Sequence, residues 1–234
     1  MKWFSEFKNK VVENFSEERW KIVKKHLGSF VWKIGLADYH SKESLSILAK
    51  TIPIGAKYIN YEAAKNIMLV ASGVEGAQDI VEAWIKSEAH IIAFAQALDS
   101  SCDILAKAIY QGLDIENNIK NPLNFRSQKL SNIQDSMVRA SYAPNVTAAI
   151  DQLLGSEEFK YLHAYVNQTK HHSLIDSKAS VSLVDKKQGL MLSEFKATDS
   201  KKKWPRKWAD DFAITDFKVI KEKLENIGIE LAHF

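Results

Sequence analysis

Residues 157–175 read EEFKYLHAYVNQTKHHSLI, and the pattern within them decides the predicted fold. Mostly apolar side chains recur there at spacings of three and four, which predicts an amphipathic helix with one buried face. They are Phe159, Leu162, Val166 and Thr169. A second set follows the same spacing on a neighbouring face, and a helix places it in one row, here called the polar stripe. The polar stripe consists of His163, Asn167, Lys170 and His171. Two imidazoles, an amide and an ammonium beside a buried face indicate a candidate site.

The composition is typical of a globular protein rich in helices. The chain has 234 residues, of which 46% are hydrophobic and 26% charged, enough for one large domain or two small ones. Only 4 prolines and 9 glycines interrupt it, and so few breakers favour helices. The formal net charge of +3 permits contact with phosphates but does not require it. Since no repeat or flexible linker stands out, we expect residues 1–234 to form a single, mainly α domain.

The single cysteine and the distribution of apolar residues indicate a cytoplasmic protein without a membrane partner. Cys102 can form neither an internal disulfide nor a cysteine-based zinc site, and its apolar neighbours predict a buried thiol. The first residues mix charged and apolar side chains, unlike a secretory signal. No apolar run reaches the roughly 18 residues of a membrane span.

Residues 75–112 predict one long central helix. After Gly76 they contain no proline and no internal glycine, and apolar residues follow steps of three and four over a length on the order of 50 Å. The seam consists of Val81, Trp84, Glu88, Ile91, Ala95, Leu98, Cys102, Leu105 and Ile109. Asp99 and Asp103 lie on or near this seam, either as a solvated edge or facing a basic partner such as Lys170 or His171. We favour the solvated edge.

The N-terminal part predicts shorter helices. Residues 1–27 favour one or two helices, with Ser16 capping the second and Gly28 ending it. We expect three large side chains there to pack in the core: Trp20, Val31 and Trp32. From Ser41 the helical pattern restarts and then breaks at Pro53 and Gly55.

The second half predicts three more short helices and one hairpin. The helices are 130–138, 146–154 ending at Gly155, and a last one with apolar residues at 212, 217, 220, 224 and 227. Ser156 is placed to cap the helix of residues 157–175. Residues 179–197, with SVSLVD and LMLSEFK around a short loop containing Gly189, predict a β-hairpin. A lone hairpin is marginal in water, so it is expected to lie on the helices or on another copy of itself.

Residues 201–208, KKKWPRKW, allow two interpretations. Cations with interleaved tryptophans can hold a nucleic-acid backbone and stack on bases. The candidate contacts are Lys201, Lys202, Lys203, Arg206 and Lys207. Alternatively, the segment is a solvated turn whose tryptophans anchor the hairpin to the helices. We favour the anchoring interpretation because the segment is short and contains an ordering proline.

The string YVNQTKHHSLI, preceded by the long helix SEAHIIAFAQALDSSCDILAKAI, resembles the HEPN superfamily of small α-helical proteins. It is most similar to bacterial members with an N-x-x-K-H motif followed by a β-hairpin. The resemblance implies a helical bundle that forms a homodimer, with an R-x4-6-H motif at the dimer cleft. In active members this motif implies metal-independent cleavage of RNA, in which the arginine stabilises the phosphate charge and the histidine transfers a proton.

Transferred residue by residue, the motif departs from the family pattern at one position. Its asparagine matches Asn167 and its histidine matches His171, but the arginine position falls on Val166. Lys170 offers a positive charge one turn away, although lysine is a point charge and lacks the bidentate fork of arginine. If the chain cleaves RNA, the resemblance makes His171 the general acid or base, Lys170 the electrostatic stabiliser and Asn167 the orienting residue.

Three interpretations of the polar stripe therefore stay open. It is a weak metal-independent endoribonuclease site, a degenerate site that binds RNA or a nucleotide, or a structural element of a noncatalytic interaction protein that builds a homodimer interface. A metal site is not expected, because His163 and His171 are roughly 12 Å apart along a helix and the adjacent His172 points elsewhere. No phosphate-binding glycine loop, G-x-S-x-G elbow or H-E-x-x-H pair is present, so no cofactor is predicted.

Overall fold

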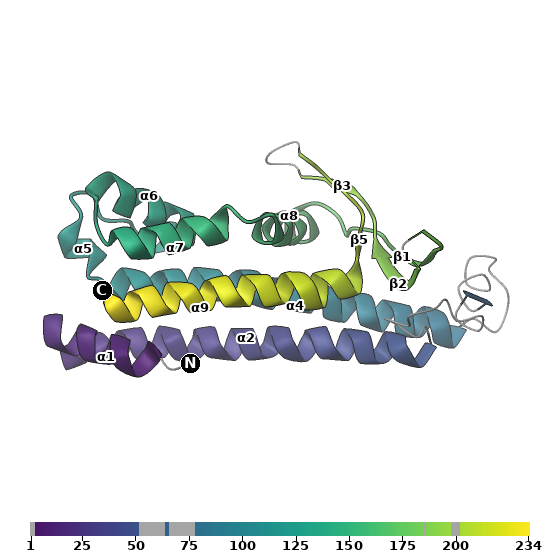
Figure 1. Ribbon diagram of the computed structural model, residues 1–234, viewed down its shortest axis with the longest axis horizontal. Coiled ribbons are helices and arrows are strands. Elements are labelled where there is room, and N and C mark those ends of the chain that lie inside the picture. The colour runs from purple at the N-terminus through teal and green to yellow at the C-terminus, as the bar shows by residue number, and fades with distance from the viewer. Residues whose placement is uncertain (1–2, 52–63, 66–77, 185, 198–201) are drawn as a thin grey trace. The chain divides into compact units, whose positions relative to one another are not determined.

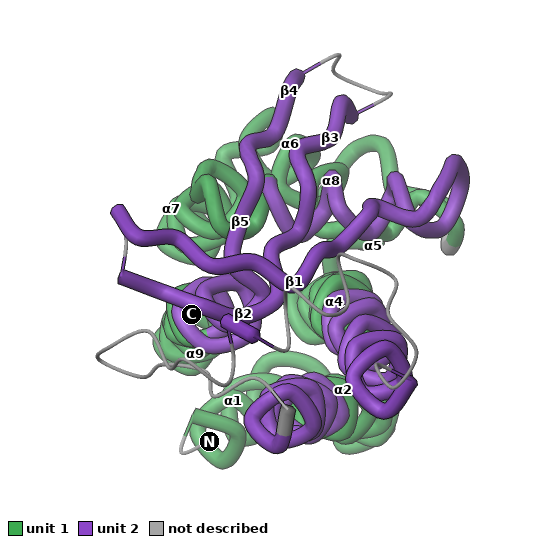
Figure 2. The backbone as a smooth tube through the Cα atoms, turned by 90° about the vertical axis from the view of Figure 1, so that its right-hand side faces the viewer, with its two compact units in different colours: residues 1–35, 97–160, 218–234 green, residues 36–96, 161–217 purple. Residues whose placement is uncertain are grey.

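The computed structural model describes residues 3–51, 64–65, 78–184, 186–197 and 202–234, and the fold below refers to them. The prediction of a mainly α fold with a small hairpin near the C-terminus is confirmed (Figure 1). No helix in these ranges is long and apolar enough to cross a membrane. Contacts divide the chain into two compact units, which Figure 2 colours separately: residues 1–35, 97–160 and 218–234 form unit 1, and residues 36–96 and 161–217 form unit 2.

The helices have the following bounds in chain order. They are α1 (Trp3–Asn14), α2 (Glu17–Thr51), α4 (Gln78–Gly112), α5 (Ile115–Asn118), the 3-10 helix η1 (Phe125–Ser127), α6 (Leu130–Ala140), α7 (Pro144–Leu154), α8 (Glu157–His171), the π-helix η2 (Asp211–Asp216) and α9 (Phe217–His233). The expected helices at 130–138 and 146–154 are confirmed as α6 and α7, and Gly155 follows α7 as predicted.

Helix α2 corrects two predictions about where helices end. It runs through Gly28 and Ser41 without a break, so neither residue bounds a helix. A glycine inside a helix costs only about 1 kcal/mol, and α2 offsets that cost with a long buried face. This face consists of Trp20, Val23, Leu27, Phe30, Ile34, Ala37, Ser41, Ser44 and Leu48. The expected breaks at Pro53 and Gly55 lie outside the described residues.

Two residues of the same helix that were predicted to lie in the core are exposed. Trp20 is buried as expected, but Val31 is 40% exposed and Trp32 is 71% exposed. They are the next two residues after the buried Phe30, and each step along a helix turns the side chain by about 100°, which points both away from the core. At the start of α2, Ser16 acts as the predicted cap, because its Oγ accepts a hydrogen bond from the Arg19 N–H at 3.1 Å.

Helix α4 is the predicted long helix. It spans Gln78–Gly112, and the expected start at residue 75 lies outside the described residues. Cys102 is 2% exposed, and burial together with the negative charge of Asp99 raises the pKa of its thiol. The favoured solvated edge is wrong for Asp99, which is 8% exposed, and correct for Asp103, which is exposed. Asp99 and Asp103 lie four residues apart on one face of α4, so the phase of the helix does not account for their different exposure.

In unit 1, α1 packs through two aromatic side chains onto glycines. A Cβ added at Gly228 of α9 would overlap the indole ring of Trp3, and one at Gly112 of α4 would overlap the ring of Phe7. Trp3 and Phe7 are 3% and 1% exposed, so each fills a site that exists because its neighbour has no side chain. An ion pair between Arg19 and Asp114 at 2.7 Å joins the start of α2 to the residue before α5.

Unit 2 contains the strands. A hairpin is present as predicted, formed by β1 (Ser177–Ser182) and β2 (Lys187–Leu192), which are antiparallel with Ala179 opposite Leu190. Two details of the prediction are wrong, because Gly189 lies within β2 and not in the loop, and β2 ends at Leu192. The short strand β5 (Lys207–Trp208) adds to β2 as a third strand, with Met191 opposite Trp208. A separate pair is formed by β3 (Phe195–Lys196) and β4 (Lys203–Trp204). The hairpin is therefore covered along one edge by the chain that follows it, which meets its need for a partner.

An aromatic cluster forms the core of unit 2. Phe212 of η2 is fully buried, and its ring centroid lies 5.2 Å from those of Tyr161 and Tyr165 and 5.3 Å from that of Phe94. Edge-to-face arrangements at such distances add stability beyond the area that they bury. The cluster therefore joins α8, α4 and η2.

Candidate functional site

Helix α8 presents the predicted apolar face to the core. Its cap is as predicted, because the Ser156 Oγ accepts a hydrogen bond from the Phe159 N–H at 3.4 Å. Leu162 and Val166 are fully buried and Phe159 is 8% exposed. The partly buried Thr169 donates its hydroxyl to the Tyr165 carbonyl at 3.0 Å. The helix thus has one defined buried side and one side left for the polar stripe.

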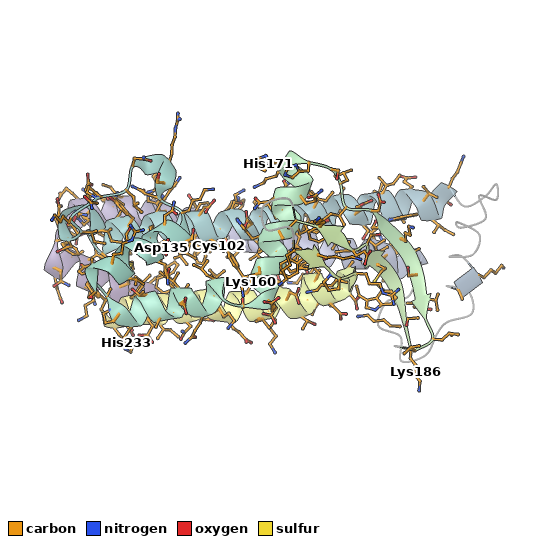
Figure 3. The ribbon with its side chains drawn as sticks, turned by 90° about the horizontal axis from the view of Figure 1, so that it is seen from above. Cys102, Asp135, Lys160, His171, Lys186 and His233 are labelled. Atoms are coloured by element: carbon orange, nitrogen blue, oxygen red, sulfur yellow. The ribbon has the colours of Figure 1, made fainter. Side chains whose placement is uncertain are left out.

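The polar stripe lies on that other side of α8 and ends where the helix ends. His163, Lys170 and His171 are exposed, and Asn167 is half-buried. Figure 3 shows His171 at the end of α8 that leads toward the hairpin, with Lys160 at the other end of the helix. The His172 N–H still makes a helical bond to the Gln168 carbonyl at 3.0 Å, but the Ser173 N–H donates to the same carbonyl at 3.1 Å, so the helical pattern stops there.

A lysine and a histidine therefore lie in the last turn of α8. Lys170 and His171 face the negative end of the helix dipole, where a positive charge typically contributes about 0.3–1 kcal/mol. This accounts for their position without any ligand. It also leaves two side chains that can donate hydrogen bonds to a phosphate at one exposed helix end, although the helix dipole at that end disfavours an anion.

Val166 is the residue onto which the resemblance places the arginine of the motif. The side chain is 0% exposed and belongs to the same buried face as Leu162. A guanidinium at this position would point into the core, because the backbone of α8 fixes the direction of the side chain. Residue 166 therefore adds no positive charge to the polar stripe. The stripe lacks the forked phosphate ligand that an arginine would supply.

The tryptophans of the basic segment agree with the anchoring interpretation. Trp204 and Trp208 are 6% and 7% exposed. The Trp204 ring centroid lies 5.7 Å from that of Tyr161, and Trp208 pairs with Met191 of β2. Both indoles are thus packed in unit 2, and neither is open to stacking on a base.

Most of the cations of the same segment contact other groups of unit 2. Lys203 is paired with Glu194 at 2.7 Å, and Lys207 with Asp216. The ammonium of Lys202 lies 3.7 Å from the Trp204 ring centroid. The following Arg206 is exposed, and Lys201 lies outside the described residues.

A small polar cavity, which sequence reasoning missed, lies beside this segment. It has a volume of about 350 Å³ and is lined by Lys187, Met191, Arg206, Trp208 and Asp211. Burial acts to lower the pKa of Lys187, but hydrogen bonds to Asp211 at 2.6 Å and to Asp210 outweigh it, so this pKa lies above its ordinary value. The ammonium is neutralised by two carboxylates and so serves the fold.

Glu88 is a half-buried carboxylate near α8. Burial raises its pKa, a hydrogen bond with Ser177 acts to lower it, and the charge of Asp176 adds to the increase. The Ser177 Oγ also accepts a hydrogen bond from Trp84 Nε1 at 2.7 Å. Glu88 in turn helps to raise the pKa of Tyr165, after the larger effect of burial. A carboxylate whose pKa is raised in this way is typical of functional sites and also of buried hydrogen-bond networks.

A second feature that sequence reasoning missed is a pair of histidines. The Nδ1 atoms of His40 in α2 and His90 in α4 are 2.9 Å apart, which makes one ring the donor and the other the acceptor. Burial and then His90 lower the pKa of His40, against an opposing effect of Glu43. The two residues are fifty positions apart, and nothing in either local pattern indicates the contact.

We expect the free energy of unfolding to fall as the pH is lowered from about 7.5 to about 5.5. The pKa of His40 in the folded chain lies below 6.5, so the unfolded chain binds this proton more readily and gains population below pH 6.5. His40→Gln should flatten this part of the pH profile and cost about 1 kcal/mol at pH 8 through the lost hydrogen bond. Urea titrations of the parent and of His40→Gln at several pH values measure both. An unchanged slope in His40→Gln would contradict the prediction.

No group of three or more histidine, cysteine or acidic residues able to hold a metal ion is present in the part of the chain that the structure describes. Comparisons with protein-family models, with curated proteins and with solved structures found no match to this chain. Its function is therefore inferred from its own residues.

Proposed function

We propose that this chain binds RNA through the polar stripe of α8 and does not cleave it, as a degenerate member of the HEPN-like class. The observation that carries the proposal is the burial of Val166 beside the exposed Lys170 and His171. Two donors that suit phosphate oxygens thus lie at the exposed end of one helix. The position of the motif's arginine faces the core and supplies none.

The chemistry of RNA cleavage explains why binding is proposed and catalysis is not. Attack by a 2′-hydroxyl needs a proton acceptor and fixed donors at the oxygens where charge develops. His171 can exchange a proton, but only Lys170 in the stripe carries a fixed positive charge, and it is exposed on a flexible stem. An exposed single ammonium adds affinity for phosphate more readily than it stabilises a transition state, because solvent screens it equally in both states.

Lys170→Ala is expected to weaken RNA binding several-fold at low salt. Removing one phosphate contact should also reduce the dependence of log K on log salt by about 0.7 for a single strand. Fluorescence anisotropy with labelled RNA at several salt concentrations measures both quantities. The matched control is Lys160→Ala, an exposed lysine at the opposite end of α8 that is paired with Glu157 at 3.3 Å. If the two variants bind RNA equally well, the polar stripe is not the contact site.

A cleavage assay tests the second half of the proposal. Mixed structured and single-stranded RNAs in EDTA are expected to stay intact with the parent and with His171→Ala. Products with 2′,3′-cyclic phosphate ends from the parent alone would contradict the noncatalytic assignment and make His171 the general acid or base.

A second candidate function is that of an interaction protein in which the polar stripe forms a homodimer interface. The observation that favours it is Leu174, three residues after the stripe, which is 64% exposed while the next residue, Ile175, is 4% exposed. An apolar side chain on the rim of a polar row is suited to a protein contact. Light scattering on the parent and on Leu174→Asp separates the two functions. A dimer that dissociates in the variant supports the interface, and unchanged RNA binding by the same variant supports the first proposal.

A further inference from the structure

The most exposed of the described tryptophans lies in a groove of unit 1. Trp32 is 71% exposed, whereas Trp84 is partly buried and the other four are buried. Trp32 lines an open groove of about 740 Å³ together with Gly28 of α2 and Ile104 of α4. A large ring left in water beside open space is unusual, because burying it would remove much apolar surface from the solvent.

Four lysines surround this ring. Lys21, Lys24, Lys25 and Lys33 all line the same groove. Among the described residues, the ion pairs of α2 use Arg19 and Lys42 and none of these four. Burial, Lys107 and Lys25 together lower the pKa of the adjacent His26, as expected where positive charge accumulates. The groove therefore combines one aromatic face with several cations that no described carboxylate neutralises.

Gly28 leaves space next to the ring. It lies one helical turn before Trp32, on the same face, and a Cβ built at Gly28 meets nothing within 4 Å. A flat group can therefore lie against the helix beside the indole without displacing a side chain. This is the arrangement that a stacked base requires.

We propose that the groove around Trp32 binds a single-stranded segment of RNA. Trp32 stacks on one base, and the lysines contact the phosphates on either side of it. Stacking on aromatic side chains in a basic groove is how proteins hold single strands with little sequence preference. The inference deepens the proposed function, on which it rests for the choice of RNA; the groove itself is an observation independent of α8.

A membrane surface fits the groove less well. A helix that lies on a membrane turns its apolar face to the lipid. The apolar face of α2 is already used in the core, where Val23, Leu27 and Phe30 are each 0–1% exposed. Among the residues that line the groove, Trp32 has the only aromatic ring, and it lies in a hollow and not on a convex surface.

The test uses short labelled oligonucleotides and the full chain. Trp32→Ala is expected to weaken binding of single-stranded oligo(U) and oligo(A) about tenfold or more, whereas Trp32→Phe keeps most of the affinity. Lys24→Ala with Lys25→Ala should reduce the salt dependence by about 1.4, two single-strand contacts. Ile22→Ala, which is 49% exposed on the same helix but does not line the groove, is the matched control and should bind as the parent does.

Tryptophan fluorescence is a second measurement and reports on the Trp32 ring itself. Bound oligonucleotide should quench tryptophan emission in the parent and not in Trp32→Phe, because the other described tryptophans are buried, except the partly buried Trp84. Unchanged affinity in Trp32→Ala would overturn the proposal. So would emission changes on vesicles of phosphatidylserine and phosphatidylcholine without binding of the oligonucleotides, which would assign the groove to a membrane surface.

The same titrations distinguish RNA binding at the groove from RNA binding at the polar stripe. A loss in Trp32→Ala with none in Lys170→Ala supports the groove and rejects α8 as the site. The reverse result leaves the proposed function standing and overturns the groove. Absence of any binding to RNA by the parent rejects both.

Discussion

Phe212→Ala should lower the free energy of unfolding by about 3–5 kcal/mol, the usual cost of removing a buried phenylalanine ring. The ring is 0% exposed and packs against Tyr161, Tyr165 and Phe94 at centroid distances of 5.2–5.3 Å. Its loss leaves a cavity among large, rigid side chains that cannot collapse to fill it. For a chain of this size each kcal/mol corresponds to about 2–4 °C in Tm, so a calorimetric scan and a urea titration should both show the change.

The neighbouring Ile214 supplies the control for this prediction. It belongs to the same π-helix but is 53% exposed, and Ile214→Ala should change stability by no more than about 0.5 kcal/mol. Similar losses in both variants would show that the helix, and not the aromatic cluster, is the sensitive feature. A loss below about 1 kcal/mol in Phe212→Ala would contradict the packing described for unit 2.

Gly228→Ala should destabilise the chain by about 1–3 kcal/mol, although alanine is the better helix former. The new methyl group would overlap the indole of Trp3, a 3% exposed ring with no free space to move into. Gly35→Ala is the matched control, since this exposed helical glycine has nothing within 4 Å of an added Cβ and should gain about 1 kcal/mol from helix propensity. Urea titrations of the two variants should therefore shift in opposite directions. A gain in both would mean that α1 does not pack on α9 as described.

The parts of the fold that depend on local periodicity were predictable. Helices α4, α6, α7 and α8 follow from apolar residues at steps of three and four, and the hairpin follows from its two runs of strand-forming residues. The position of the turn was not predictable in this way, because Gly189, expected in the loop, lies within β2. The full length of helix α2 was not predictable in the same way, because the effect of Gly28 was considered without the apolar face on either side of it. Its cost of about 1 kcal/mol is small beside a buried face that continues on both sides of it.

Exposure of single side chains was harder to predict than helices were. Trp32 was expected in the core because tryptophan is large and apolar, but its angular position on α2 opposes that of Phe30 and Ile34. The phase of the helix therefore decided its exposure. The same reasoning applied to α8 correctly predicted Leu162 and Val166 as buried, because there the whole apolar row was considered together.

Contacts between distant segments lay beyond the sequence. The His40–His90 hydrogen bond and the third strand β5 both join residues far apart in the chain, and no single sequence records which helix faces meet. The polar stripe was predicted as a row on one helix, which the structure shows, whereas its role stays a prediction. The groove around Trp32 was missed for the same reason that Trp32 was misplaced.

The burial of Cys102 makes the chain suitable for labelling experiments without engineering. It is the only cysteine in the sequence, and its thiol is shielded inside unit 1. A thiol reagent can modify it only when unit 1 opens, so the labelling rate measures the free energy of that opening under native conditions. Comparison with the free energy of complete unfolding tells whether unit 1 opens by itself or only with the whole chain. A cysteine introduced at an exposed position would, for the same reason, carry a fluorophore while the native thiol stays unmodified.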